Sequence, residues 1–368
     1  MPSITLRRPR RTTRTTRPVV KTVAAGLLLA MPLSACATGG SPEPAPPEKA
    51  ALSATAPATQ RVVAGRALEV RTSPLTGLRT SSRILARPVL TVKIENTAAA
   101  RPQSGLAAAD LVVEELVEGG ITRFAAMFQS RLPHHVGPVR SVRNVDASLA
   151  GPTRGLLAYS GGAGHVLRIV GRAPVKQLAP GQAGNAYYRA SHRSAPHNLY
   201  AKTRTLYSHA QNRHTKPAPY LPFAANAASA STANGKRARV LRLRFSNAEQ
   251  PTWTYDRVRH RWLRSEGDRP ARAASGARLA ARNVIVVRIR TKDAGYRDPA
   301  GNFVPETVLK GSGPALLATG GRVVRASWHK KGRDRRLRFT GPGGRPLTIA
   351  PGRTWLELVP LSGSVSVR

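Results

Sequence analysis

The chain has 368 residues, which is long enough for two domains. Of these residues 41% are hydrophobic and 21% are charged, a composition typical of globular proteins. A single cysteine, Cys36, excludes an intramolecular disulfide and a structural zinc site built from several thiolates. The formal net charge of +41 favours anionic partners such as nucleic acid, anionic lipid or an acidic wall polymer. Arginines spread over a solvated surface are the alternative explanation for the same charge.

The N-terminus carries an export signal. Residues 1–18 are basic, Val19–Pro32 is a short apolar run, and Leu33-Ser34-Ala35-Cys36 follows. The tetrapeptide resembles the bacterial lipobox, whose cysteine becomes the lipidated first residue of the mature protein. We therefore predict a lipoprotein signal peptide over residues 1–36, lipidation (palmitate) at Cys36 and anchoring at the outer face of the cell membrane. A plain signal peptide with an incidental cysteine is the alternative, and the export route, Sec or twin-arginine, stays open.

Residues 37–66 are rich in Ala, Pro, Ser and Thr and are predicted to form a flexible tether. Apolar, β-branched runs separated by turn residues then predict strands at Arg87–Ile94, Phe124–Gln129 and Gly155–Tyr159. Val145–Leu149 is expected to open a helix. Ala107–Val117 fits either a helix or a short helix that runs into a strand at Leu111-Val112-Val113.

After an Ala-, Ser- and Asn-rich linker or surface loop at 224–238, short strand patterns dominate. They lie at Val240–Phe245, Thr252–Trp262, Asn283–Ile289, Gly321–Trp328, Arg336–Thr340 and Trp355–Val359. The predicted fold class is therefore α+β, with an N-terminal αβ layered domain that has a mixed sheet (67–223) and a β-rich C-terminal domain (239–368).

Four turn motifs stand out: Arg101-Pro102-Gln103-Ser104-Gly105-Leu106, Glu118-Gly119-Gly120-Ile121-Thr122-Arg123, Gly137-Pro138-Val139-Arg140-Ser141-Val142-Arg143 and Ala195-Pro196-His197-Asn198-Leu199-Tyr200. In this order they resemble the YerB-like lipoprotein family, with its DUF3048 domain and β-rich C-terminal companion. The resemblance runs from about Pro74 to Val359 and implies a surface lipoprotein of Gram-positive-type bacteria with no established activity. Asp110 and Glu118 also match the family pattern.

Loop arginines are the candidate anion site: Arg123, Arg140, Arg143, Arg189 and Arg193. Guanidinium forks suit phosphate and carboxylate groups, and Arg140 and Arg143 would share one face if a helix begins at Ser141–Val145. The loops Glu118–Phe124, Gly137–Arg143, Ser160–His165 and Arg189–Tyr200 are expected to converge on one cleft. The alternative is structural pairing of these arginines with Asp110, Glu114, Glu118 and Asp146.

His192 and His197 are possible acid/base groups, because histidine titrates near neutral pH, or they are hydrogen-bonded structural residues. The layout of the chain is also loosely similar to that of LytR–CpsA–Psr phosphotransferases. That similarity would give Arg140, Arg143, Asp110 and Asp146 a role on a lipid pyrophosphate donor, with a divalent cation. Otherwise the sequence predicts no metal site and no cofactor. Nucleic-acid binding is less favoured, because the chain has an export signal, 5% aromatic residues and no recognised binding motif.

Overall fold

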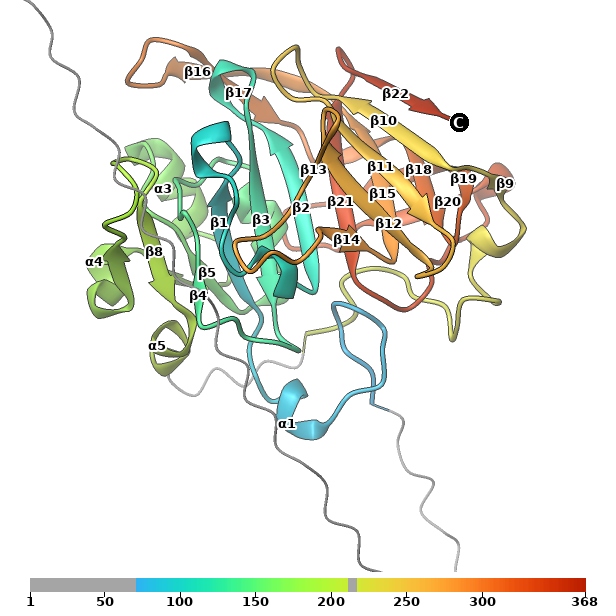
Figure 1. The fold of residues 1–368 in the computed structure, drawn as a ribbon, viewed down its shortest axis with the longest axis horizontal. Coiled ribbons are helices and arrows are strands. Elements are labelled where there is room, and N and C mark those ends of the chain that lie inside the picture. The colour runs from blue at the N-terminus through green and yellow to red at the C-terminus, as the bar shows by residue number, and fades with distance from the viewer. Residues whose placement is uncertain (1–70, 211–216) are drawn as a thin grey trace, which may run out of the picture. The chain divides into compact units, whose positions relative to one another are not determined.

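The computed structural model describes residues 71–210 and 217–368, which fall in one compact unit (Figure 1). The predicted signal peptide, Cys36 and the tether at 37–66 lie outside the described residues. Within the described ranges, no helix is both long enough and apolar enough to cross a membrane.

A mixed sheet of eleven strands forms the centre of this unit. In spatial order its strands are β20 (Arg338–Thr340), β19 (Arg322–Lys330), β18 (Gly311–Thr319), β15 (Asn283–Ile289), β21 (Thr354–Pro360), β2 (Leu111–Leu116), β3 (Thr122–Phe128), β1 (Leu90–Glu95), β5 (Leu156–Ala158) and β6 (Lys176–Leu178), with β9 (Lys236–Arg237) paired to β19. The β2–β21, β15–β21, β1–β5 and β5–β6 pairs are parallel. The predicted mixed sheet is therefore confirmed.

The remaining strands form three smaller sheets. The six-stranded sheet contains β13 (Arg269–Pro270), β12 (Arg261–Glu266), β11 (Pro251–Asp256), β10 (Val240–Arg244), β22 (Ser364–Val367) and β14 (Ala280–Ala281). A three-stranded sheet contains β4 (His135–Val136), β8 (Leu199–Lys202) and β7 (Tyr187–Arg189), and β16 (Thr291–Arg297) pairs with β17 (Phe303–Thr307). The second half of the chain is thus rich in β-structure, as predicted.

The helices are short. The α-helices are α1 (Ser82–Leu85), α2 (Asp146–Ala150), α3 (Gly164–Gly171), α4 (Pro180–Ala183) and α5 (Thr203–Ser208). The 3₁₀ helices are η1 (Ala98–Ala100), η2 (Leu106–Ala108), η3 (Glu118–Gly120), η4 (Gly151–Thr153), η5 (Gly184–Ala186), η6 (Ser231–Asn234) and η7 (Pro342–Gly344).

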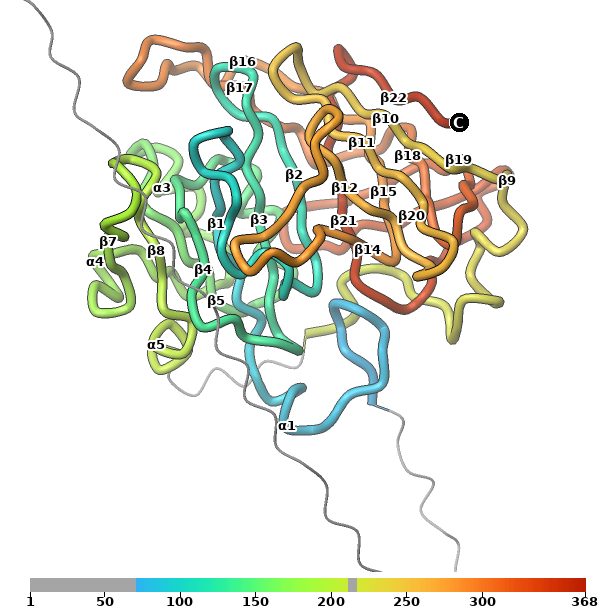
Figure 2. The backbone as a smooth tube through the Cα atoms, viewed as in Figure 1, coloured from blue at the N-terminus to red at the C-terminus, as the bar shows by residue number. Residues whose placement is uncertain are grey.

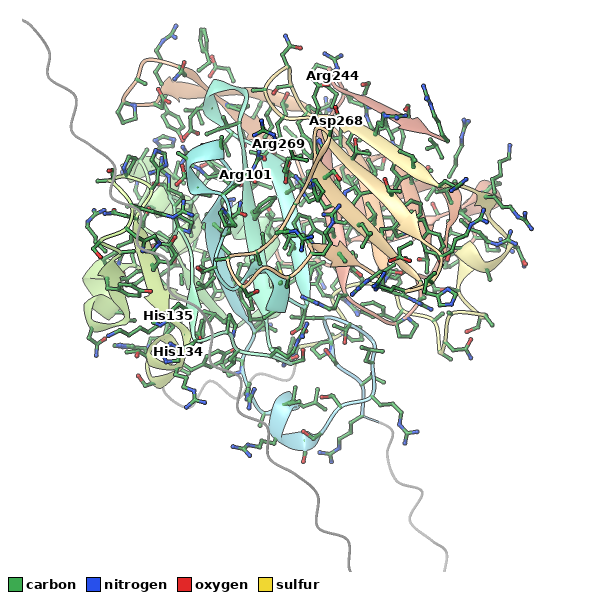
Figure 3. The ribbon with its side chains drawn as sticks, in the orientation of Figure 1. Arg101, His134, His135, Arg244, Asp268 and Arg269 are labelled. Carbon is green, nitrogen blue, oxygen red and sulfur yellow. The ribbon has the colours of Figure 1, made fainter. Side chains whose placement is uncertain are left out.

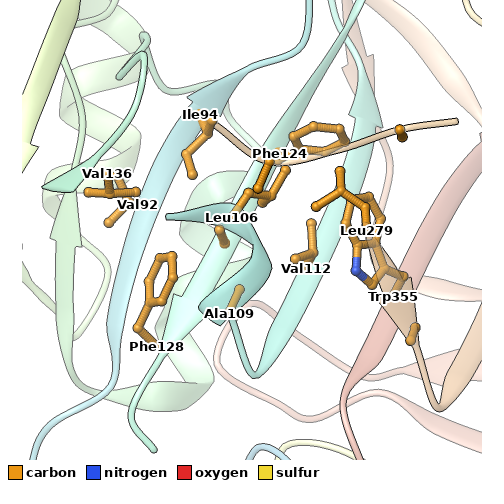
Figure 4. Packing of buried hydrophobic residues seen from close by; sticks show 14 of the residues in the cluster. Val92, Ile94, Leu106, Ala109, Val112, Phe124, Phe128, Val136, Leu279 and Trp355 are labelled. Carbon is orange, nitrogen blue, oxygen red and sulfur yellow. The ribbon is translucent and has the colours of Figure 1, made fainter. Parts of the chain in front are cut away.

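The central strands are buried on both faces, which explains their nearly continuous apolar sequences. One face, here called the sandwich face, carries Val112, Phe124 and Trp355 (Figure 4). On this face the ring centroids of Trp355 and of Trp253 in the six-stranded sheet lie 5.2 Å apart. The opposite face, here called the helix face, packs Val113, Ala125 and Leu356 against Leu149 of α2. Because side chains alternate along a strand, each central strand contributes to two separate cores.

The connection from β13 to β14 crosses the sandwich face in front of β1–β3 (Figure 2). Its Ala274 N–H donates to the carbonyl of Gln103, with an N–O distance of 2.9 Å. This connection therefore joins the six-stranded sheet to the loop that follows β1.

Of the two alternatives predicted for Ala107–Val117, the structure has the short helix that runs into a strand, because η2 ends at Ala108 and β2 begins at Leu111. The helix predicted at Val145–Leu149 is present as α2, which begins at Asp146 after the N-cap Val145. Arg140 and Arg143 precede it, so they do not share a helix face. The physical reason is that Asp146 Oδ2 accepts the Arg143 N–H at 2.6 Å, while the Val142 N–H donates to Gly161 O at 3.0 Å.

The division into 67–223 and 239–368 stays a prediction. Strands from both ranges share the central sheet, in which β2 of the first range lies beside β21 of the second. The sheet is therefore continuous across the predicted linker at 224–238.

Gly155 offers a test of the packing around β5. A Cβ at this position would collide with the carbonyl oxygen of Val89, immediately before β1. We expect Gly155→Ala to lower the free energy of unfolding by about 1–3 kcal/mol, the usual cost of overpacking. Thermal denaturation measures the change.

Gly171→Ala is the matched control. No atom lies within 4 Å of the Cβ that it would add at the end of α3. It should be neutral or stabilise by less than about 1 kcal/mol, because alanine favours helix. Equal melting temperatures for the two variants would contradict the tight approach of β5 to Val89.

Candidate functional site

Charged residues interrupt the buried apolar strands at the centre of the sheet. Glu114 and Glu115, neighbours on β2, are 0% and 1% exposed. Because neighbouring side chains point to opposite faces of a strand, Glu114 lies on the sandwich face and Glu115 on the helix face. Buried carboxylates need partners, and each of these glutamates enters a different ion-pair network.

On the helix face, Glu115 pairs with Lys93 of β1, whose Nζ also lies 2.9 Å from Asp146 Oδ1. Burial raises the pKa of Glu115 to about 7, although the adjacent Lys93 acts in the opposite direction. The ammonium group therefore lies between two buried carboxylates and ties β1, β2 and the start of α2 together.

Arg123 and Arg143 both pair with Glu118 on the same face. Arg143 Nε donates to Glu118 Oε2 at 2.9 Å, and Arg123 also donates to the carbonyl of Ser141 at 3.0 Å. Burial and the nearby Arg143 lower the pKa of Arg123 to about 10. Burial alone would raise the pKa of Glu118, but Arg123 and Arg143 outweigh it and lower the pKa. This is the structural pairing that the sequence left open as an alternative.

Arg140 lies beside a second carboxylate of the helix face. Its Nε is 3.7 Å from Glu95 Oε2. The other oxygen of this carboxylate, Oε1, lies 2.8 Å from His197 Nδ1. Glu95 is 1% exposed, whereas the His197 side chain is 29% exposed. The buried carboxylate therefore fixes one nitrogen of the imidazole ring.

The other loop residues are fixed by neutral groups. Arg189 donates to Asn198 Oδ1 at 2.7 Å, and Arg193 donates to the carbonyls of Ala99 and Pro102 at 2.5 and 3.1 Å. His192 is exposed, with its ring centroid 6.2 Å from that of Tyr200.

The four predicted loops contact one another around Gly137–Arg143. Arg143 meets Glu118, Ser160 N–H donates to the Arg140 carbonyl at 3.0 Å, and Arg140 reaches the Pro196 carbonyl at 3.4 Å. The structure thus brings the loops together, but it engages Arg123 and Arg143 in ion pairs.

Asp110 has a local role. Its carboxylate accepts the backbone N–H groups of Gln129 and Ser130 at 2.8 and 2.7 Å, and so it fixes the turn after β3. Asp146 is bound to Lys93 and to the Arg143 N–H. Among the described residues, no group of three or more His, Cys, Asp or Glu side chains is arranged to hold a metal ion.

On the sandwich face, Arg264 of β12 is 0% exposed and is surrounded by four carboxylates, here called the carboxylate cluster: Glu114, Glu249, Glu266 and Glu357. Its NH1 and NH2 bind Glu114 at 2.7 and 3.1 Å. The rings of Phe124, Trp253 and Trp355 also lie 4.9–5.7 Å from its guanidinium carbon, within cation–π range.

The cluster holds four carboxylates and two arginines, Arg264 and Arg101. Burial, with Glu114 and Glu266 nearby, raises the pKa of Glu249 to about 8, and burial beside Glu114 raises that of Glu357. Burial would also raise the pKa of Glu266, but Arg264 and Arg101 outweigh it and lower that pKa to about 2. Arg101 NH2 lies 2.8 Å from Glu249 Oε2 at the exposed rim of the cluster. Arg101 and Arg269 line one cavity together with Glu249 and Glu266. Figure 3 shows the two arginines near each other.

A cationic cavity that no sequence motif indicated is here called the arginine groove. It has a volume of about 600 Å³, and its walls contain Arg259, Arg261, Arg278, Arg282 and Arg353, with His260, and no Asp or Glu. Leu106, Leu279 and Trp355 supply an apolar floor. The arginines come from the β11–β12 turn, the approach to β14 and β15, and the start of β21. No sequence signal places these segments together, because their proximity depends on the pairing of the sheets.

Most of these guanidinium groups are held in place without being neutralised. Arg278 donates to the Ala271 carbonyl at 2.8 Å, Arg282 to the His260 carbonyl at 3.0 Å, and Arg353 to the Ala109 carbonyl at 2.9 Å. A carbonyl acceptor fixes the side chain and leaves its positive charge and its other N–H donors in place. The Nε of Arg261 is buried with no hydrogen-bond partner among the described residues.

The charges in the groove also oppose one another. Burial lowers the pKa of Arg353 to about 10, and the nearby Arg131 and Arg261 act in the same direction. Burial, with Arg272 close by, lowers the pKa of Arg278. A bound anion would relieve this repulsion, so the groove has the electrostatics of an anion-binding site.

Comparisons with known proteins agree with the sequence resemblance. Residues 75–216 match the family described as "Protein of unknown function (DUF3048) N-terminal domain", and residues 241–356 match the corresponding C-terminal domain. YerB of Bacillus subtilis (strain 168), which bears a lipoprotein name, is 29% identical over 310 residues, covering 80% of this chain and 88% of that protein. The crystal structure of the YerB protein from Bacillus subtilis has a TM-score of 0.69 and 28% identity, covering 80% of this chain and 99% of that chain.

The carboxylate cluster predicts a pH-dependent stability. Because folding raises the pKa of Glu249 from 4.5 to about 8, the folded chain holds that proton more tightly than the unfolded chain. Its stabilising contribution is complete below pH 4.5 and is lost as the pH rises to about 8. Glu249→Gln keeps a neutral group at this position, so its melting temperature should fall less steeply over that interval.

Thermal denaturation across this pH range checks the prediction. Glu306→Gln, which removes a carboxylate from β17 outside the cluster, is the control and should keep the wild-type slope. Identical slopes for Glu249→Gln and the wild type would show that Glu249 is not protonated in the fold.

Proposed function

The chain belongs to the DUF3048 family, and we propose that it is a lipid-anchored envelope protein that binds a phosphate-bearing anion in the arginine groove. The anchor is proposed at Cys36, after the lipobox-like Leu33-Ser34-Ala35. The lipoprotein name of its relative YerB supports this part of the proposal. An exported and lipidated protein would present its folded part at the outer face of the membrane.

One observation carries the binding function: five arginines line a cavity whose walls contain no acidic residue. Arg123 and Arg143 pair with Glu118, and Arg264 lies in the carboxylate cluster. Within the groove, Arg259 pairs with Asp256 at 3.2 Å, whereas Arg278, Arg282 and Arg353 donate to backbone carbonyls. The groove therefore has cationic character beyond the overall charge of the chain. Guanidinium groups suit phosphate oxygens in particular, because two parallel N–H donors can meet two oxygens.

The phosphotransferase alternative receives less support. It would use Asp110 and Asp146 together with Arg140 and Arg143, with a divalent cation. However, Asp110 holds the turn after β3, Asp146 is paired with Lys93, and Arg143 is paired with Glu118. The arginine groove is also formed by other segments, so we place the ligand there.

The lipid anchor gives a direct prediction. Cells that express the wild-type chain should incorporate a fatty-acid probe into it, because lipidation would occur at the cysteine thiol. Cys36→Ala should abolish the labelling. The control variant Ser34→Ala, which keeps Cys36, should still be labelled, because small residues are tolerated before the cysteine. Equal labelling of the wild type and Cys36→Ala would contradict the anchor.

The groove gives a second prediction. Arg261→Gln removes a guanidinium group whose Nε has no partner in the described structure, so the fold should tolerate it. The free energy of binding inorganic triphosphate should become less favourable by about 1–3 kcal/mol, the usual contribution of a charge-assisted hydrogen bond. Isothermal titration calorimetry at low and high salt measures this loss, and salt should weaken wild-type binding.

Arg242→Gln is the charge-matched control. Arg242 is exposed on β10 and does not line the groove. Its removal changes the net charge by the same amount, so it should leave the affinity almost unchanged. Equal losses in the two variants would mean that triphosphate binds the general positive charge and not the groove.

A further inference from the structure

A second cavity of about 660 Å³, here called the second lobe, lies next to the arginine groove. Leu78, Ala225 and Pro351 line both cavities, so the two are adjacent. The second lobe contains Arg79 and Arg336, again with no Asp or Glu in its walls. Positive charge is therefore present in both lobes, with apolar residues shared between them.

Hydrogen bonds give the second lobe a fixed wall. Tyr220 N–H donates to the Pro74 carbonyl at 2.7 Å, and Ile349 N–H donates to the Pro222 carbonyl at 2.9 Å. The segment from Pro219 to Ala224 is thus held between the turn at Ser73–Leu78 and the segment before β21. Such a wall is already in place before a ligand arrives, which lowers the entropic cost of binding.

Close packing at Gly77 shapes the floor of this lobe. Gly77 has a φ of +66°, and a Cβ there would lie 2.5 Å from Cγ of Phe223. Glycine therefore permits the aromatic ring to lie directly on the turn. The apolar surface of Phe223 and Leu221 extends the floor that Trp355 and Leu279 begin in the first lobe.

The arginines of the second lobe also keep their charge. Arg336 NH1 donates to the Pro219 carbonyl at 2.9 Å, which fixes the guanidinium group on a neutral acceptor. Both Arg79 and Arg336 are exposed. Arg278, Arg282 and Arg353 of the arginine groove are held in the same way, by donating to backbone carbonyls.

From this distribution we propose that the ligand is a linear polyanion whose successive phosphate groups lie along both lobes. The inference rests on the proposed anion-binding function and adds the class of ligand. A lipid with a single phosphate group would need cations at one end only, whereas here they occur in both lobes. A polymer of phosphates separated by uncharged units would place charge on the arginines and its uncharged units on the apolar floor.

Simultaneous contact with both lobes makes the affinity depend on length. A short anion reaches one lobe, whereas a long chain bound in one lobe presents its next phosphates to the other at high effective concentration. Each added contact also releases counterions, so a long chain should show the steeper dependence on salt.

The test is a calorimetric titration of the purified full-length chain with orthophosphate, triphosphate and long-chain polyphosphate. The wild type is compared with Arg336→Gln and Arg79→Gln in the second lobe, Arg261→Gln in the first lobe, and Arg242→Gln as the charge-matched control. Melting temperatures are measured for all variants. Having two variants in the second lobe preserves the test if Arg336→Gln disturbs the Pro219 clamp.

We expect long-chain polyphosphate to bind more tightly than triphosphate by at least about tenfold. Arg336→Gln and Arg79→Gln should reduce this advantage, and they should weaken triphosphate binding less than Arg261→Gln does. Arg261→Gln should weaken the binding of both anions, and Arg242→Gln should weaken neither.

Several outcomes would separate this inference from the function on which it rests. If triphosphate and long-chain polyphosphate bind equally, and only Arg261→Gln weakens them, the anion site stands and the polymer inference fails. If decyl phosphate, an amphiphile with one phosphate, binds as tightly as long-chain polyphosphate, the polymer inference also fails. If no groove variant differs from Arg242→Gln with any anion, both the inference and the proposed function fail.

Discussion

The fold depends on the burial of Arg264 between two sheets. Its guanidinium group binds Glu114 and Glu357 of the central sheet and Glu266 of its own strand, and three aromatic rings close around it. A buried charge that loses one partner becomes very unfavourable, so the sheets must keep these positions together. The same contact positions β12, and β12 in turn positions the turn that carries Arg259 and Arg261 of the groove.

The backbone could be predicted from the sequence to a considerable extent. Strands such as Asn283–Ile289 are β-branched and bounded by turns, and the structure has β15 at the same residues. The β18 strand was not predicted, because Gly311, Ser312, Gly313 and Pro314 give its first half no apolar pattern. Its pairing with β19 over nine residues and with β15 over five makes it a strand in spite of its sequence.

The site was harder to predict, because charge in a sequence carries no information about its partners. Arg123 and Arg143 lie in motifs whose residues are typical of an anion site, yet both arginines pair with Glu118. Conversely, Arg261, Arg278 and Arg353 have no motif, and they meet because β12, β14 and β21 lie close together in the sheets. The distinction lies in the acceptor: a carboxylate neutralises an arginine, whereas a backbone carbonyl only orients it.

The adjacent glutamates of β2 have a consequence for strand alignment. Glu114 serves Arg264 on one face, and Glu115 serves Lys93 on the other. A slip of β2 by one residue would bring Val113 or Leu116 to one of these positions and remove one carboxylate partner from a buried cation. The two charges thus act as a register lock at the middle of the sheet, where apolar side chains alone would tolerate sliding. Replacing either of the two consecutive acids in β2 would therefore weaken this lock.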